Sequence, residues 1–86
     1  MIMKLEEYKT WLLEHGEIKE EYKRPYNPQC DPLEYKDGSY FLSYDLMYAG
    51  QPYAGFAVGD VSPLTCYKYV YDESKAYLEA RLKHEI

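Results

Sequence analysis

The sequence has no apolar run long enough to cross a bilayer, and it holds only two cysteines and two histidines in 86 residues. A membrane-spanning helix needs about 20 consecutive apolar residues, so we expect no membrane segment. Residues 1–7 also lack the apolar stretch of a secretory signal. Without an export signal the two thiols are expected to stay reduced, and the cytoplasm is the predicted compartment.

Metal-binding and nucleophilic residues are too few and too dispersed to predict a site. A structural zinc ion takes four ligands at short spacings, whereas Cys30, Cys66, His15 and His84 are spread along the chain. A cysteine nucleophile needs a base beside it, and no motif supplies one. We therefore expect no metal, no cofactor and no catalytic residue, and we predict that the protein is not an enzyme.

Phenylalanine and tryptophan are scarce, and tyrosine takes their place. The chain has two Phe and one Trp against 12 Tyr. Tyrosine combines a large apolar ring with a hydroxyl that needs water or a hydrogen-bond partner. Two interpretations stay open: the tyrosines are half-buried filler of a thin core, or several form a contact surface, because tyrosine is enriched at interface hot spots.

Positive charge is scarce as well. Fifteen acidic residues against ten basic ones give a net charge of −5. A protein that follows a phosphate backbone needs a basic stripe. Direct binding of nucleic acid or of an anionic membrane is therefore not expected.

The N-terminal part of the chain predicts a helix over residues 3–15. Leu5, Tyr8 and Leu12 repeat at i, i+3 and i+7, which places them on one side of a helix. Gly16 suits the left-handed position that ends many helices. Residues 17–24 fit a helix or a strand equally well.

Three prolines within residues 25–32 predict an irregular connection, which we expect Tyr26 to pack against the domain. The dipeptide Asp37-Gly38 then separates two alternating apolar runs and predicts a two-residue hairpin. In this hairpin Tyr35 would pair with Tyr40, and the second strand would continue to about residue 47.

A second turn at residues 49–52 leads into a predicted strand over 53–59. Gly55 and Gly59 leave one face of that strand open, and we expect a helix to cover them.

The C-terminal part allows two interpretations. Residues 65–71 are β-branched and aromatic, which favours a strand, with Asp72 then capping a helix over 73–84. Alternatively, Ser62-Pro63 starts one long helix over 63–84. We prefer the strand followed by the helix.

The predicted fold is therefore α+β, in a single domain of residues 1–86. An N-terminal helix, an antiparallel meander of three or four strands and a C-terminal helix follow one another, with the helices packed on one face of the sheet.

Tyr40, Tyr44 and Tyr48 share one face of the predicted central strand, whereas Phe41 and Met47 share the other. If the helices cover the Phe41 face, the three tyrosines point outward together. If the helices cover the tyrosine face, the same rings form the core.

On this chemistry we hypothesise a small acidic protein-binding domain, an inhibitor encoded by a phage or other mobile element. It would block a host protein, for example a nucleic-acid-binding one whose basic channel attracts carboxylates. The predicted partner-binding residues are four tyrosines and six carboxylates: Tyr26, Tyr40, Tyr44, Tyr48, Glu17, Glu20, Glu21, Asp31, Glu34 and Asp45.

Two alternatives come from other classes of protein. One is a structural or oligomeric accessory protein, in which an uncovered tyrosine face pairs two copies as a homodimer. The other is a weak nucleic-acid-binding module that stacks bases on a tyrosine-lined sheet face.

Overall fold

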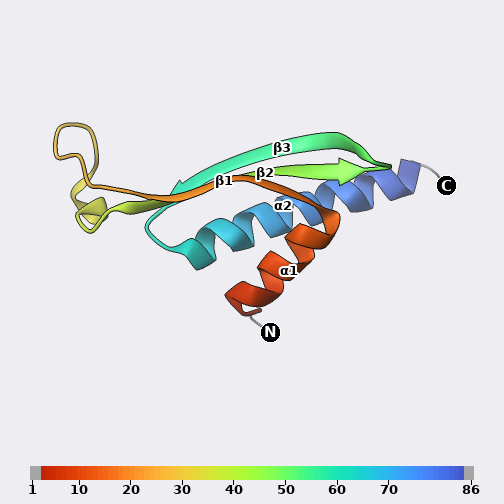
Figure 1. Ribbon diagram of the computed structural model, residues 1–86, viewed down its shortest axis with the longest axis horizontal. Helices are drawn as coiled ribbons and strands as arrows, with labels where there is room; N and C mark the ends of the chain where they lie inside the picture. Colours follow the sequence, from red (N-terminus) through yellow and green to blue (C-terminus); the bar gives the residue numbers. More distant parts are fainter. Residues whose placement is uncertain (1–2, 85–86) are drawn as a thin grey trace.

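The two α-helices among the described residues lie on the same face of one antiparallel sheet (Figure 1). The structure, a computed structural model, describes residues 3–84. Its elements are α1 (Leu5–His15), β1 (Gly16–Arg24), the short 3-10 helix η1 (Leu33–Tyr35), β2 (Ser39–Tyr48), β3 (Gln51–Asp60) and α2 (Pro63–His84). The strands follow the order β1-β2-β3. The predicted α+β fold is confirmed.

Helix α1 ends where the sequence predicts, but Gly16 serves a different purpose. Its φ of −178° is extended rather than left-handed, so the residue begins β1. A Cβ atom at this position would collide with the carbonyl oxygen of Asp45 and the phenol of Tyr44. Glycine is therefore required here by the close approach of β2.

A β-bulge at Lys19 decides which residues of β1 face the helices. Ile18 pairs with Tyr44, but Glu20, not Lys19, pairs with the next residue of β2. An extra residue shifts the two-residue alternation of a strand by one. Glu21 consequently faces the helices, and Glu20 lies on the opposite face of the sheet.

The predicted hairpin at Asp37-Gly38 is wrong. Residues 33–35 form η1 instead of a strand, and β2 pairs with β1 and β3. Gly38 has a φ of +96°, and its N–H donates to the carbonyl of Tyr35 at 2.7 Å. The dipeptide thus makes a tight turn, but that turn closes a loop that projects from one end of the molecule (Figure 1).

The two-residue hairpin lies instead at Ala49-Gly50, between β2 and β3. Tyr48 pairs with Gln51, and the two central residues have φ values of 54° and 79°. Positive φ at both positions is the mark of a type I′ turn, whose twist matches that of the flanking strands.

Helix α2 runs without a break from Pro63 to His84, so the preferred interpretation of a strand followed by a helix is wrong and the single long helix is right. Ser62 caps its first turn, because the side-chain oxygen accepts from the N–H of Thr65 at 3.4 Å. Asp72 lies in mid-helix. The helical spacing prevails because it places the residues Cys66, Tyr67, Val70 and Ser74 on one buried side.

The core lies between the helices and the face of β2 that carries the even-numbered residues. Its fully or almost fully buried apolar residues are Tyr8, Leu12, Leu42, Tyr44, Leu46, Cys66, Tyr67 and Val70. The helices therefore cover the tyrosine face of β2. Over residues 3–84, neither helix combines the length and the apolar character that crossing a membrane requires.

Replacing Gly16 by alanine should lower the free energy of unfolding by about 2 kcal/mol or more, because the new methyl group would overlap the backbone carbonyl of Asp45. Urea unfolding of Gly16→Ala and Gly55→Ala would test this. Gly55 is the matched control, since its added Cβ would meet only the Asp45 side chain at 3.4 Å. Equal stability of the two variants would contradict the close approach.

Candidate functional site

A carboxylate and two phenols meet where the helices lie against β1 and β2. The hydroxyls of Tyr40 and Tyr67 both donate to the Glu21 carboxylate. Lys9 of α1 places its Nζ 3.9 Å from the other carboxylate oxygen. We call these four residues the Glu21 cluster. Glu21 lies on β1, Tyr40 on β2, Tyr67 on α2 and Lys9 on α1. The cluster thus links both helices to the sheet.

The carboxylate and the two phenols of the Glu21 cluster keep their protonation states at neutral pH. Burial acts to raise the pKa of Glu21, but the two phenol hydrogen bonds and Lys9 together lower it. Burial and the neighbouring carboxylate raise the pKa of Tyr40 to about 12 and raise that of Tyr67 as well. The carboxylate is therefore charged and both phenols are protonated, so none of the three groups exchanges a proton near pH 7.

Tyr44 fills the centre of the core. It is fully buried, and its hydroxyl donates to the carbonyl of Leu12 at 2.6 Å. Leu12 lies in the last turn of α1, where carbonyls lack partners within the helix, and burial raises the pKa of this phenol. Tyr44 is thus unavailable to a partner in the folded protein, contrary to its prediction as a contact residue.

Tyr48 also lies on the helix side of the sheet, at the end opposite the long loop. Its ring lies 5.9 Å from that of Tyr53, and the Arg81 guanidinium lies 5.3 Å above it. A second bulge makes Tyr53 the extra residue of β3, and its ring reaches Tyr77 of α2 at 6.4 Å. These rings fasten the end of α2 to the sheet.

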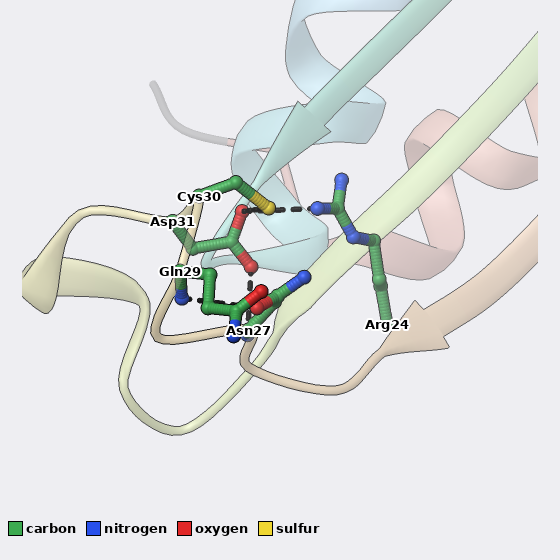
Figure 2. Close-up of polar contacts among 5 residues, drawn as sticks. All are labelled: Arg24, Asn27, Gln29, Cys30 and Asp31. Atoms are coloured by element: carbon green, nitrogen blue, oxygen red, sulfur yellow. Dashed lines mark hydrogen bonds and ion pairs between the residues drawn. The ribbon is translucent and has the colours of Figure 1, made fainter.

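Asp31 organises the start of the loop after β1 (Figure 2). Its carboxylate accepts from Arg24 Nη2 and from the N–H of Asn27, both at 2.9 Å. Asn27 in turn accepts from the N–H of Gln29 at 3.0 Å, and the exposed thiol of Cys30 lies beside the same carboxylate. Because only 13% of the Asp31 side chain is exposed, it holds the loop together rather than presenting charge.

The predicted partner-binding residues do not form one surface. Tyr26, half-buried, and Glu34, exposed, lie with Asp31 in the projecting loop. Glu21 and Tyr40 belong to the Glu21 cluster, and Tyr44 and Tyr48 lie under the helices. The remaining three, Glu17, Glu20 and Asp45, lie together on the face of the sheet that carries no helix.

That uncovered face carries an aromatic pair. Tyr22 of β1 and Phe41 of β2 are directly opposite in the ladder, with ring centroids 5.1 Å apart. Neither ring belongs to the core, and 47% of Tyr22 is exposed. Met47 lies further along β2. β3 contributes Gly55, Ala57 and Gly59, all of them exposed, so the expectation that a helix covers the two glycines is wrong. We call this surface the open face and define it by Glu17, Lys19, Glu20, Tyr22, Phe41, Ser43, Asp45, Met47, Gly55, Ala57 and Gly59.

The charges of the open face gather beside the aromatic pair. Lys19 Nζ lies 4.0 Å from both Glu17 and Asp45, so one cation is shared between two carboxylates. Glu20 adds a third carboxylate, which leaves this part of the face acidic. The alternation along β2 is enough to predict that Phe41 and Asp45 share one face. The position of Tyr22 on the same face could not be predicted from the sequence, because it depends on the bulge at Lys19.

A shallow hollow of about 410 Å³ lies along α1 and is lined by Met3, Glu6, Glu7, Thr10, Trp11 and Glu14. One helix with its N-terminal flank provides the whole lining, so the hollow brings together no groups from separate elements. We do not regard it as the functional site.

Comparison with known protein families, with curated proteins and with solved structures finds no match in any of the three.

Glu21→Gln should lower the free energy of unfolding by about 1–2 kcal/mol at pH 7, because the phenols lose a charged acceptor. The pKa of Glu21 is lowered in the folded state, so its stabilisation is complete above the ordinary value and disappears as pH falls through the folded value. The difference between variant and wild type should therefore shrink below about pH 4.5.

Urea unfolding between pH 3 and 7 would measure this difference. Glu20→Gln is the matched control, because the neighbouring carboxylate lies on the other face of the sheet, and we expect a change within about 0.5 kcal/mol. A pH-independent effect of Glu21→Gln would contradict the described hydrogen bonds.

Tyr44→Phe should destabilise the fold by about 1–2 kcal/mol, since it leaves the buried Leu12 carbonyl without its donor. Tyr69→Phe, at an exposed position of α2, should change stability by less than about 0.5 kcal/mol. Thermal unfolding of both variants distinguishes a buried hydrogen bond from the general effect of removing a hydroxyl.

Proposed function

We propose that this chain is a protein-binding domain and that the open face is its contact surface. The observation that carries the proposal is the Tyr22–Phe41 pair, with Tyr22 exposed and Phe41 half-buried, on a sheet face without helices and beside three carboxylates. Aromatic side chains are enriched where protein interfaces are fully desolvated. This surface replaces the tyrosine face of β2 as the proposed site.

The charge of the open face favours a basic partner. On this face Glu17, Glu20 and Asp45 outnumber the cations Lys19 and Arg24, and the Arg24 guanidinium is already paired with Asp31. The whole chain carries a net charge of −5. Such a field steers association with a positively charged surface and repels an acidic one. A basic channel of a nucleic-acid-binding protein fits this chemistry, so the proposed activity is inhibition by occupying that channel. Cytoplasmic location and an origin in a phage or other mobile element belong to the same proposal.

Binding rather than turnover is part of the proposal. The lowered pKa of Glu21 and the raised pKa values of Tyr40 and Tyr67 leave none of these three groups to exchange a proton near pH 7, and both phenols donate to the carboxylate. The alternative of base stacking on the tyrosine face loses its surface, since Tyr44 is fully buried and the carboxylates of the open face repel phosphates.

Charge reversal on the open face should abolish partner binding. We expect Glu20→Lys combined with Asp45→Lys to weaken affinity at least tenfold, about 1.4 kcal/mol, and Phe41→Ser alone to do the same by removing the aromatic pair. The measurement is affinity capture from the host with the wild-type chain, followed by titration calorimetry of the captured protein against each folded variant.

Glu14→Lys combined with Glu79→Lys is the matched control. It changes net charge by the same amount at exposed helix positions away from the open face. If the control weakens binding as much as the open-face variant, total charge rather than this surface governs the interaction, and the proposed site is wrong. A gel shift with oligonucleotides at low salt tests the nucleic-acid alternative.

A further inference from the structure

The two edge strands of the sheet differ in how they are protected. Both present unpaired backbone groups along their outer side, which natural proteins shield with charges, proline or bulges. β1 has six charged residues among nine, and a bulge at Lys19. β3 has none before its last residue, Asp60, and its Pro52 and bulge at Tyr53 lie together at its start. Residues 54–59 are therefore an uncharged, regular edge.

The helix beside this edge is also exposed and mostly uncharged. The ring of Tyr77 on α2 contacts that of Phe56 on β3, with centroids 5.2 Å apart. Tyr71, on another side of the helix, contacts Tyr8 of α1, with ring centroids 5.0 Å apart. Tyr69 and Ala80 stand eight residues before and three after Tyr77, so they share its side of α2. Tyr69 and Tyr77 are 46% and 45% exposed.

We propose that β3 pairs with β3 of a second copy of this chain, antiparallel about a twofold axis, to form a continuous six-stranded sheet. Edge strands recruit extended partners through main-chain hydrogen bonds, and a twofold interface must match its own surface. Self-pairing of residues 54–59 places no charged side chain opposite another. The exposed flank of α2, carrying Tyr69, Tyr77 and Ala80, then meets its own copy below the sheet.

A charge within this flank is complemented by charges beyond its end. Phe56 lies near the middle of β3 and contacts Tyr77, so a twofold axis through the middle of the strand passes near Tyr77. Glu73, one turn before Tyr77, would then lie opposite the last turn of the other α2. That turn carries Arg81, Lys83 and His84. The second copy therefore offers basic residues where the flank is acidic.

The area fits a weak dimer that dissociates on dilution. The six-residue edge is about 20 Å long, and the sheet and helix layers together are about 20 Å deep. The pairing would bury roughly 400 Å² on each copy, or roughly 800 Å² in total, which is the size of a weak, transient interface. The dimer also joins two open faces into one surface, but its formation does not depend on the proposed partner.

Sedimentation velocity of the purified chain over about two decades of concentration around 10 µM tests the pairing. We expect a dimer that dissociates on dilution. Ala57→Lys combined with Tyr69→Lys, which charges the strand edge and the helix flank, should weaken dimerisation at least tenfold. Ser43→Lys combined with Leu82→Lys is the matched control: Ser43 pairs with Ala57 but lies on the central strand, and Leu82 lies on the Tyr71 side of α2. It should dimerise as the wild type does.

Two results would overturn the proposal: a wild-type chain that stays monomeric at all concentrations, or a dimer that the edge variant leaves intact. If the edge variant fails to fold, amide exchange of the wild type decides. Exchange in residues 54–59 that slows with rising concentration supports self-pairing, and exchange that is independent of concentration contradicts it. Protection that appears only on adding a different protein would assign the edge to that partner instead and refute the dimer. None of these outcomes bears on the open face.

Discussion

The Glu21 carboxylate imposes the strongest constraint on this fold, because the helices draw a charge partly out of water. A carboxylate that loses part of its hydration is stabilised by donors that replace the lost water. Tyr40 and Tyr67 supply two hydroxyls and Lys9 a cation, and each comes from a different element. The bulge at Lys19 is what turns Glu21 toward them. The hydrogen bonds of this one group thus connect both helices to β1 and require hydroxyls that phenylalanine lacks.

The abundance of tyrosine has a physical explanation in the thin core. A chain of this size buries little volume, so large rings must reach from the core to its rim, where a hydroxyl finds a partner. The Tyr44 hydroxyl donates a hydrogen bond to the Leu12 carbonyl in the last turn of α1. Tyr8 and Tyr71 pack the two helices together, and Tyr53 and Tyr77 fasten the far end of α2. Phenylalanine would fill the same space but leave the polar groups unmatched.

Local sequence signals predicted those elements whose periodicity agrees with their packing. Helix α1 and the alternation along β2 fall in this group, because each has one clear apolar side. The Asp37-Gly38 hairpin failed because a turn dipeptide specifies a bend and not the strands around it. Residues 33–35 form η1 within a loop, and the start of that loop is held by the hydrogen bond from the Asn27 N–H to Asp31. No local sequence pattern predicts this contact. For residues 65–71, the choice of helix over strand depended on the sheet that the residues cover.

The candidate site was harder to predict than the fold because it depends on a bulge. Ile18 and Tyr22 stand four residues apart, which in a regular strand places them on one face. The extra residue at Lys19 separates them, so Ile18 packs against the core and Tyr22 joins Phe41 outside. The same shift divides the adjacent carboxylates, leaving Glu20 on the open face.

The open face is uncovered because α1 and α2 both pack on the other side of the sheet (Figure 1). Two helices are enough to cover one side of three strands, and the loop of residues 25–38 projects beyond the end of the sheet instead of folding over its other side (Figure 1). Because the tyrosines of β2 lie on the helix side of the sheet, the aromatic surface of the open face is the smaller Tyr22–Phe41 pair. A face of three strands spans roughly 400 Å², about half of what one partner contributes to a typical interface. A single copy is therefore suited to a modest contact, and a surface of full size requires a second sheet beside the first.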